Sequence, residues 1–340
     1  MRELAKDVSR RFRPAVNRPA VGPRASRAPL AGAAAAVAAL ALAAAPAEGG
    51  RGWRAEPPLP EARSEVAAAA TAEGVIAVAG GFAEDGSPSA RVDLYDTGTA
   101  GWTRGPDLPQ PLDHAAAASL HGRVVLAGGY GEERPTATAL ELAGGEWRAL
   151  PPLPAPRAAA GAVALRGKLY VVAGVGPHGL ATQMLVYDPG PRRWTTAPGP
   201  TPRQHLAVAA AAGRLYAIGG RSAGYDTNLA LVESWAPGER RWRREPSLPA
   251  PRGGTAAAAA GGAVVVAGGE APQGTEASVL ALSPGAARWR RLPDLPTPRH
   301  GLGVVAAGGL VYVLGGGPEP GLSTSDANEA LPAAAAGPAG

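Results

Sequence analysis

The 340-residue chain contains no cysteine, which excludes disulfide bonds and thiolate metal sites. It also lacks a long apolar run: residues 30–45 are apolar and mostly alanine, whereas a membrane-spanning helix needs about 20 such residues. A broad basic surface is missing as well. The whole chain carries +5, but residues 1–29 carry a net +6, which leaves about −1 for the remainder. A near-neutral domain without a basic stripe lacks the charge pattern that phosphate binding needs, so nucleic acid is not an expected partner.

The basic residues belong to an N-terminal leader instead. Residues 1–29 form a positive segment, residues 30–45 an apolar segment, and small residues follow around Ala43–Ala47. This order is typical of a secretory signal peptide, so residues 1–47 are predicted to direct the protein to the periplasm or the cell exterior. The alternative is that the leader stays attached as an anchor, which would be the only expected contact with a membrane.

The rest of the chain is built from a unit of about 47 residues that occurs six times. Three marks recur in phase: a small-residue doublet that closes a short apolar strand, a tryptophan, and an arginine that follows a proline-rich turn. The doublets are Gly80-Gly81, Gly128-Gly129, Ala173-Gly174, Gly219-Gly220, Gly268-Gly269 and Gly315-Gly316. The tryptophans are Trp53, Trp102, Trp147, Trp194, Trp242 and Trp289, and the arginines are Arg63, Arg157, Arg203, Arg252 and Arg299.

Each unit is predicted to contain four short strands. In the fourth unit these are residues 203–212, residues 215–218, a strand through Leu231 and Trp235, and residues 242–249, with turn residues between them. The first strands are rich in alanine, which on propensity alone favours helix. The strand interpretation is preferred because each alanine run is short, recurs at one phase and would lie at a crowded ring axis.

These marks resemble the Kelch repeat, in which a glycine doublet and a spaced tryptophan mark one four-stranded blade. The resemblance implies an all-β fold, a six-bladed β-propeller over residues 48–335, with a disordered tail at residues 336–340. Trp53 begins a fourth strand before any first strand has appeared, and no tryptophan follows Gly316 at the expected phase. Residues 53–59 are therefore predicted to complete the sixth blade and close the ring.

Candidate site residues are those that the repeat does not require. His114, His205 and His300 come just after the arginine position, where the first strand enters from one face of the ring. They are predicted either to be solvated at the channel mouth or to contact a ligand there. No metal is predicted, because residues of non-adjacent blades are rarely close enough to share an ion. The other ligand-binding candidates are Arg203 and Arg299, together with Arg221, Asp226 and Glu65. The repeated arginines, Arg203 and Arg299 included, are expected mainly to hold neighbouring blades together through hydrogen bonds and stacking.

Two further sets of polar residues are candidates for the same face of the ring. Glu329 and Glu65 are acid–base candidates if they reach the channel. The variable loops that follow the doublets contribute polar side chains to the same face, namely Glu84, Asp85, Tyr130, His178, Arg221, Tyr225, Asp226, Asn228, Glu270, Gln273 and Glu319. No catalytic residue can be assigned, because no nucleophile–base pair, phosphate loop or metal-ligand spacing is recognisable.

The resemblance implies three functions of different classes. Most Kelch propellers are binding modules, so an exported monomer that presents its channel mouth to a protein or carbohydrate is expected, with no cofactor and no enzymatic role. The alternative is a sugar mutarotase or epimerase of the sialic acid mutarotase type, which acts through acid–base residues in the channel. A copper enzyme of the galactose oxidase type is disfavoured, because its radical cofactor needs a cysteine and the chain has none.

The leader gives the first testable prediction. Protein isolated from its native host is expected to begin between Ala44 and Gly49, because a peptidase that recognises small residues cuts after the apolar segment. N-terminal sequencing measures this directly. An intact residue 1–29 segment on protein from a cytoplasmic fraction would contradict it.

Overall fold

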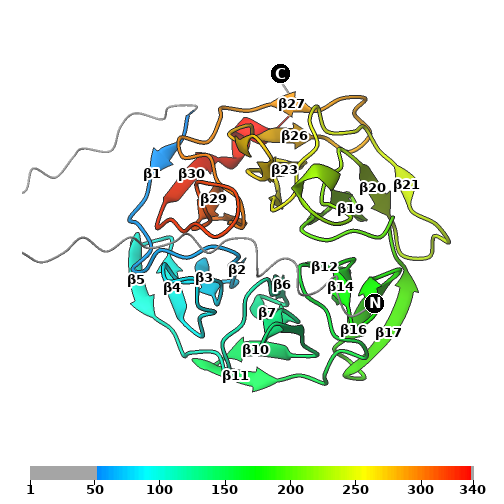
Figure 1. The fold of residues 1–340 in the computed structure, drawn as a ribbon, viewed down its shortest axis with the longest axis horizontal. Helices are drawn as coiled ribbons and strands as arrows, with labels where there is room; N and C mark the ends of the chain where they lie inside the picture. The colour runs from blue at the N-terminus through cyan, green and yellow to red at the C-terminus, as the bar shows by residue number, and fades with distance from the viewer. Residues whose placement is uncertain (1–51, 338–340) are drawn as a thin grey trace, which may run out of the picture. The chain divides into compact units, whose positions relative to one another are not determined.

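Each sequence repeat forms one four-stranded antiparallel sheet, and six sheets stand around a common axis (Figure 1). The computed structural model describes residues 52–337, so the predicted leader lies outside the described residues. Within this range no α-helix is present, and no helix is long and apolar enough to cross a bilayer. The prediction of an all-β, six-bladed propeller is confirmed.

The blades are numbered one to six along the chain, and their strands are given from the axis to the rim. Blades one to three contain β2 (Ala67–Ala70), β3 (Val75–Ala79), β4 (Val92–Asp96) and β5 (Gly101–Arg104); β6 (Ala116–Leu120), β7 (Arg123–Ala127), β10 (Ala139–Ala143) and β11 (Glu146–Ala149); and β12 (Gly161–Leu165), β13 (Lys168–Val172), β16 (Gln183–Asp188) and β17 (Arg193–Pro198). Blades four to six contain β18 (Ala207–Ala211), β19 (Arg214–Ile218), β20 (Val232–Trp235) and β21 (Arg243–Arg244); β22 (Ala256–Ala260), β23 (Ala263–Ala267), β26 (Leu280–Leu282) and β27 (Arg290–Arg291); and β28 (Gly303–Ala307), β29 (Leu310–Leu314), β30 (Asn328–Pro332) and β1 (Arg54–Ala55).

The loops between second and third strands carry the remaining elements. Three of these loops form small hairpins whose strands have two residues each. The loop of blade four contains a short 3₁₀ helix instead. The hairpins are β8 (Tyr130–Gly131) with β9 (Arg134–Pro135), β14 (Val175–Gly176) with β15 (Gly179–Leu180), and β24 (Glu270–Ala271) with β25 (Gly274–Thr275); the helix is η1 (Tyr225–Thr227).

The ring is closed by the N-terminal strand, as predicted. β1 pairs with β30, with Arg54 opposite Ala330 and Ala55 opposite Glu329 (Figure 1). The innermost strands also form a closed circle, because each contacts the first strands of both neighbouring blades and β2 contacts β28. The first and last described strands therefore share a sheet, which removes a free sheet edge.

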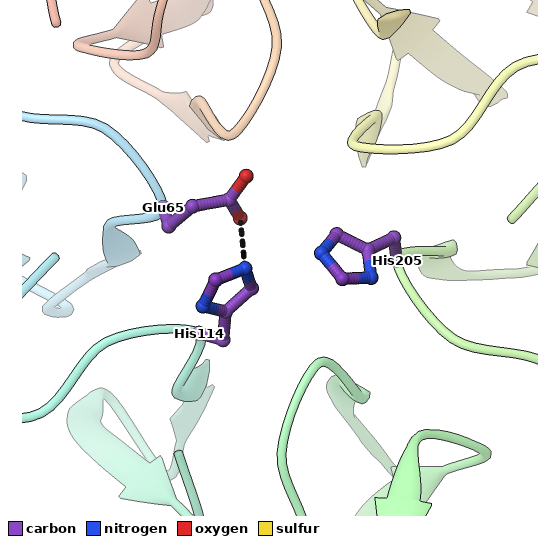
Figure 2. Close-up of side chains that lie close together, drawn as sticks. All are labelled: Glu65, His114 and His205. Atoms are coloured by element: carbon purple, nitrogen blue, oxygen red, sulfur yellow. Dashed lines mark ion pairs between the residues drawn. The ribbon is translucent and has the colours of Figure 1, made fainter. Parts of the chain in front are cut away.

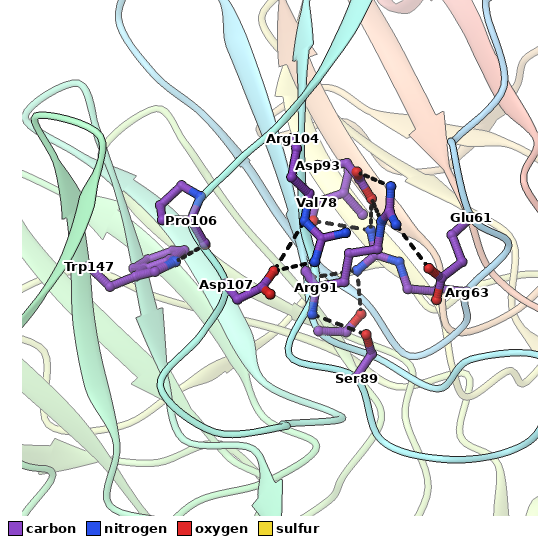
Figure 3. A network of polar contacts seen from close by, with 11 residues as sticks. Glu61, Arg63, Val78, Ser89, Arg91, Asp93, Arg104, Pro106, Asp107 and Trp147 are labelled. Atoms are coloured by element: carbon purple, nitrogen blue, oxygen red, sulfur yellow. Dashed lines mark hydrogen bonds and ion pairs between the residues drawn. The ribbon is translucent and has the colours of Figure 1, made fainter.

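The repeated tryptophans hold neighbouring blades together. Each indole Nε1–H donates a hydrogen bond of 2.7–2.9 Å to a proline carbonyl oxygen of the preceding blade. Figure 3 shows one of these bonds, from Trp147 to Pro106. The acceptor prolines of Trp53, Trp102, Trp147, Trp194, Trp242 and Trp289 are Pro293, Pro57, Pro106, Pro151, Pro198 and Pro246.

The repeated arginines are buried inside their own blades. Arg63 donates to Asp93 at 2.7 Å and to the carbonyl oxygen of Val78 (Figure 3). Arg203 and Arg299 are fully buried and pair with Glu233 and Glu329 in the same way. Their side chains therefore do not border the channel mouth as ligand-binding groups, and Glu329 is not a channel acid. Because a charge left unpaired in the interior is costly, these three pairs fix the turn that leads into the first strand of blades one, four and six.

Neighbouring blades are linked at the arginine position by the backbone. The second glycine of each doublet donates its N–H to the carbonyl oxygen of this residue in the next blade, at 2.8–3.0 Å. In blade two the acceptor is Leu112, which replaces the arginine. The expectation that arginine side chains bridge neighbouring blades is corrected accordingly: these side chains bind within a blade, whereas their carbonyl groups bind between blades.

The alanine runs are strands, as predicted, and they surround a narrow channel. Ala68, Ala117, Ala162 and Ala257 line it, and its volume is about 140 Å³. Small side chains are needed there because the six first strands converge on the axis.

Two boundary predictions were wrong. In blade four, β18 begins at Ala207 rather than Arg203, because residues 203–206 turn toward the axis, and β21 contains only Arg243 and Arg244. At the C-terminal end, a 3₁₀ helix, η2 (Ala333–Ala336), follows β30, and Ala336 is buried. Arg290 donates to the carbonyl oxygen of Ala335, so residue 336 belongs to the packed domain rather than to a tail.

The doublet geometry generates a prediction about stability. Gly81 has φ +91°, and a Cβ there would clash with the carbonyl oxygen of Ser64. Gly145 has a similar φ, +80°, but open space around it. Gly145→Ala is expected to lower the free energy of unfolding by about 1–2 kcal/mol through backbone strain. Gly81→Ala is expected to cost a further ~1–3 kcal/mol because the backbone must also shift.

Urea denaturation of the two variants measures the difference. Because both substitutions share the positive φ, the comparison isolates the clash. Equal destabilisation of the two variants would show that close backbone approach at the doublet does not constrain the fold.

Candidate functional site

The six residues that lead into the first strands form a collar around the axis. The axial collar consists of Glu65, His114, Ala159, His205, Gly254 and Gly301, and all six have φ between +50° and +64°. Each stands two positions after the arginine or its replacement, so the repeat places all of them at one level. A left-handed backbone costs a non-glycine residue about 1–2 kcal/mol. The fold uses glycine at two of these positions, which makes the larger side chains at three others unusual.

Backbone hydrogen bonds connect the collar into a ring. His114 donates to Glu65, Ala159 to His114, His205 to Ala159, Gly254 to His205 and Gly301 to Gly254, at 2.8–3.2 Å, and Val66 donates to Gly301 at 3.3 Å. The positive φ directs these N–H groups around the axis instead of along a strand. As a result, the collar side chains project from a framework that is fixed on both sides.

Three collar side chains converge on the axis from different blades. Figure 2 shows Glu65 of blade one, His114 of blade two and His205 of blade four facing one another. Nε2 of His114 lies 3.4 Å from Oε2 of Glu65, and the His114 and His205 ring centroids are 4.8 Å apart. A Cβ at Gly301 would lie 2.6 Å from Oε1 of Glu65, so the absence of a side chain there leaves room for the carboxylate.

A second layer of polar side chains surrounds the collar. The residue after each doublet pairs with the residue before each collar position, which brings the two sets of loops together on one face as predicted. His300 lies with Nδ1 3.3 Å from Oε1 of Glu65 and 3.6 Å from Oε2 of Glu270. Glu270 is paired with Arg221 at 2.7 Å. Asp113 Oδ1 lies 2.6 Å from Nδ1 of His114.

Aromatic rings complete one side of the mouth. Phe82 and Tyr130 contact the His114 ring edge to face, with centroid distances of 5.7 and 5.5 Å. Both are only partly buried. The guanidinium of Arg221 lies over the ring of Tyr225, 4.8 Å from its centroid. The mouth thus combines aromatic surface with groups that donate and accept hydrogen bonds.

Burial and the neighbouring charges shift the pKa values of the titratable groups in the cluster. Burial disfavours ionisation of Glu65, but His114, a hydrogen bond from His300, and His205 outweigh it and hold the pKa of this carboxyl well below its usual value. Burial also opposes a charge on His114 and His300, yet Glu65 and neighbouring carboxylates raise the pKa of both. Burial, Arg221 and His114 together lower the pKa of His205 well below its usual value.

The structure brings together most of the predicted site residues. Glu65 contacts His114 and His300, the rings of His114 and His205 are in contact, and Arg221 joins the cluster through Glu270, which lies beside His300. Asp226 does not join them, because it lies exposed on η1. Arg203 and Arg299 are confined to blade interiors, as described above.

Sequence analysis missed part of the cluster. Asp113 and Phe82 were not identified, and Tyr130 and Glu270 were noted only as loop residues. One signal was available for Asp113, which occupies the same repeat position as His300. Another was available for Phe82, one of two phenylalanines in the chain, which directly follows a doublet.

Comparisons with known proteins agree with this architecture. Residues 202–249, which include blade four, match the family model of the Kelch motif. The Kelch-like protein terF of Aspergillus terreus (strain NIH 2624 / FGSC A1156) is 28% identical over 242 residues, which are 64% of this chain and 52% of terF. The chain therefore spans about half the length of that relative. The solved structure of YjhT aligns with a TM-score of 0.68 and 16% identity, covering 80% of this chain and 95% of YjhT, and this likeness shows the fold.

The collar generates a prediction that separates packing from function. His205→Gly relieves a left-handed backbone strain of about 1–2 kcal/mol, which offsets the lost contacts and the greater freedom of glycine in the unfolded chain. Its free energy of unfolding is expected to stay within ~1 kcal/mol of wild type. Ala159→Gly is the matched control, because Ala159 shares the collar position and φ but has no polar side chain. Loss of more than ~2 kcal/mol in His205→Gly, but not in the control, would make the imidazole a packing group.

Proposed function

We propose that this six-bladed propeller, which matches the Kelch motif over residues 202–249, binds a small carbohydrate at the mouth of its channel. The observation that carries this proposal is the convergence of Glu65, His114 and His205 at the collar, beside the aromatic rings of Phe82 and Tyr130. Sugar hydroxyl groups need both donors and acceptors, and the apolar faces of sugar rings suit aromatic side chains. Such a combination of aromatic lining and a few fixed polar groups is typical of small-molecule sites.

The depth of the cluster favours a small ligand over a protein surface. The side chains of Glu65 and His114 are each only 14% exposed, so a flat partner surface would not reach them. Glu65, His114 and His205 line the same cavity as the alanine side chains of the first strands. The ligand is therefore expected at the collar, below the loops that follow the doublets. If the leader directs export, as proposed from residues 1–47, this binding takes place in the periplasm or outside the cell.

A second function, sugar mutarotation, is favoured by one feature of the same site. Glu65 and His205 face each other across the mouth (Figure 2), so proton-transfer groups would flank a bound sugar on two sides. Mutarotation moves the anomeric hydroxyl proton to a base while an acid protonates the ring oxygen. The ring opens, and it recloses on the other face with both protons returned. No bond to the protein and no redox step is required.

Titration calorimetry with neutral and acidic monosaccharides, including sialic acid, tests the binding proposal on the full chain. Glu65→Gln is expected to weaken binding 10- to 100-fold, because a hydrogen bond to a charged group contributes about 1.5–3 kcal/mol. Glu146→Gln is the control, since Glu146 is exposed on β11, the outermost strand of blade two. Equal affinity of the Glu65 variant and wild type would place the ligand elsewhere.

Anomer-resolved NMR on sialic acid separates binding from catalysis. If the protein is a mutarotase, sub-stoichiometric protein accelerates anomer equilibration, and His205→Gly slows it while the fold is retained. If sugar binds but equilibration proceeds at the rate seen without protein, the protein is a binding module only.

A further inference from the structure

We propose that Glu65, His114 and His205 bind one divalent transition-metal ion of the zinc class at the collar. Each side chain offers one ligand atom, and these atoms all lie within 4.8 Å of one another. Two imidazoles and one carboxylate form a common ligand set of catalytic zinc sites, in which the fourth position is left to water or substrate. Convergence at the axis brings together residues of non-adjacent blades, which removes the reason for predicting no metal from the sequence.

The spacing is close to that of a formed site. Metal–ligand bonds of 2.0–2.1 Å in a tetrahedron separate neighbouring ligand atoms by about 3.3 Å. Nε2 of His114 and Oε2 of Glu65 are already 3.4 Å apart. Figure 2 shows the His205 ring across from them, with one nitrogen directed toward the pair. The ligand atoms all lie within 4.8 Å of one another, so a small rotation of the His205 side chain would complete the three-ligand set.

Outer groups hold two of the ligands in a binding orientation. Asp113 accepts from Nδ1 of His114 at 2.6 Å, which leaves the Nε2 lone pair toward Glu65. His300 lies 3.3 Å from the other carboxylate oxygen of Glu65. Its own Nε2 contacts the carbonyl oxygen of Glu319 at 3.0 Å. A carboxylate behind a ligating histidine is the usual outer partner in zinc sites, because it fixes the ring and increases its basicity.

His300 holds Glu65 from its outer side. The His300 side chain is only 2% exposed, and its Nδ1 lies 3.3 Å from Oε1 of Glu65 and 3.6 Å from Oε2 of Glu270. This contact leaves Oε2 of Glu65, which lies 3.4 Å from Nε2 of His114, for the metal ion.

A divalent ion is compatible with the charged groups of the cluster. Three carboxylates, those of Glu65, Asp113 and Glu270, face Arg221 and the imidazoles of His114 and His300. An ion held by Glu65, His114 and His205 would lie beside these carboxylates. A second possible triple, Glu65 with Glu270 and His300, is less suitable because Arg221 and the Gly321 N–H already occupy Glu270.

The backbone supports the same assignment. Glycine would remove the left-handed strain at any collar position, and the chain uses it at Gly254 and Gly301. The three proposed ligands are non-glycine residues in this left-handed conformation, as is Ala159. Strained backbone positions of this kind cluster at functional sites.

Metal titration of the full chain after EDTA treatment and dialysis tests the proposal without any sugar. Zn²⁺ calorimetry is expected to show one tight site per chain, and Co²⁺ is expected to give d–d absorption bands of a low-coordinate site. His205→Gly is expected to weaken Zn²⁺ binding at least 100-fold with the fold retained. Asp113→Asn is expected to weaken it 10- to 100-fold, the usual effect of losing an outer-shell carboxylate.

The remaining two histidines provide the control. His121 and His178 are exposed, and the double variant His121→Ala/His178→Ala removes them without touching the collar. It is expected to bind Zn²⁺ as wild type does. The proposal is overturned if wild type binds no Zn²⁺ more tightly than His205→Gly, or if the double variant loses the tight site.

The sugar measurements fail or succeed separately from the metal measurements. Sugar binding is measured on both the EDTA-treated and the Zn²⁺-loaded chain. A tight zinc site without sugar binding supports the metal inference and contradicts the proposed carbohydrate function. Sugar binding to the EDTA-treated chain, with no tight zinc site, supports the carbohydrate function and contradicts the metal inference.

Discussion

The structure depends on the close approach of backbones at the ring axis. Two sets of left-handed residues make this approach possible. The doublets donate N–H groups to the next blade, and the axial collar passes hydrogen bonds from blade to blade. Every blade contributes the same backbone hydrogen bonds, so no single contact determines the geometry at the axis. The collar side chains are therefore not needed to hold the ring together.

Ring closure also assembles the site. Glu65 follows the N-terminal strand by only ten residues, and its neighbour His300 precedes the last blade. Pairing of β1 with β30 joins these two parts of the chain (Figure 1). The Glu65–His300 contact therefore exists only in the closed ring, and the most polar part of the mouth lies at the seam. Any loosening of the closure would first affect the side chains that we propose to bind ligand and metal.

Two classes of charged residue serve different purposes. Arg63, Arg203 and Arg299 are paired inside single blades, where they define the turns that precede the first strands. The collar and its second layer contain histidines and carboxylates from several blades, held at contact distance above an alanine-lined channel. The first class recurs because the same turn recurs in several blades. The second class does not repeat, because a single site at the axis needs each group only once.

The sequence by itself determined the blades and their closure. Trp53 appears before any first strand, and the doublets recur in phase; both signals are local and periodic, so they specify strands without three-dimensional information. It also marked His114 and His205 as departures from the repeat. Only the tertiary structure decided that these residues meet Glu65, which is 140 positions from His205. It likewise decided that Arg203 and Arg299 point into blades and that Asp113 and Glu270 belong to the cluster. The physical reason is that six strands converge at the axis, so contacts there depend on the radius of the ring, which no linear pattern records.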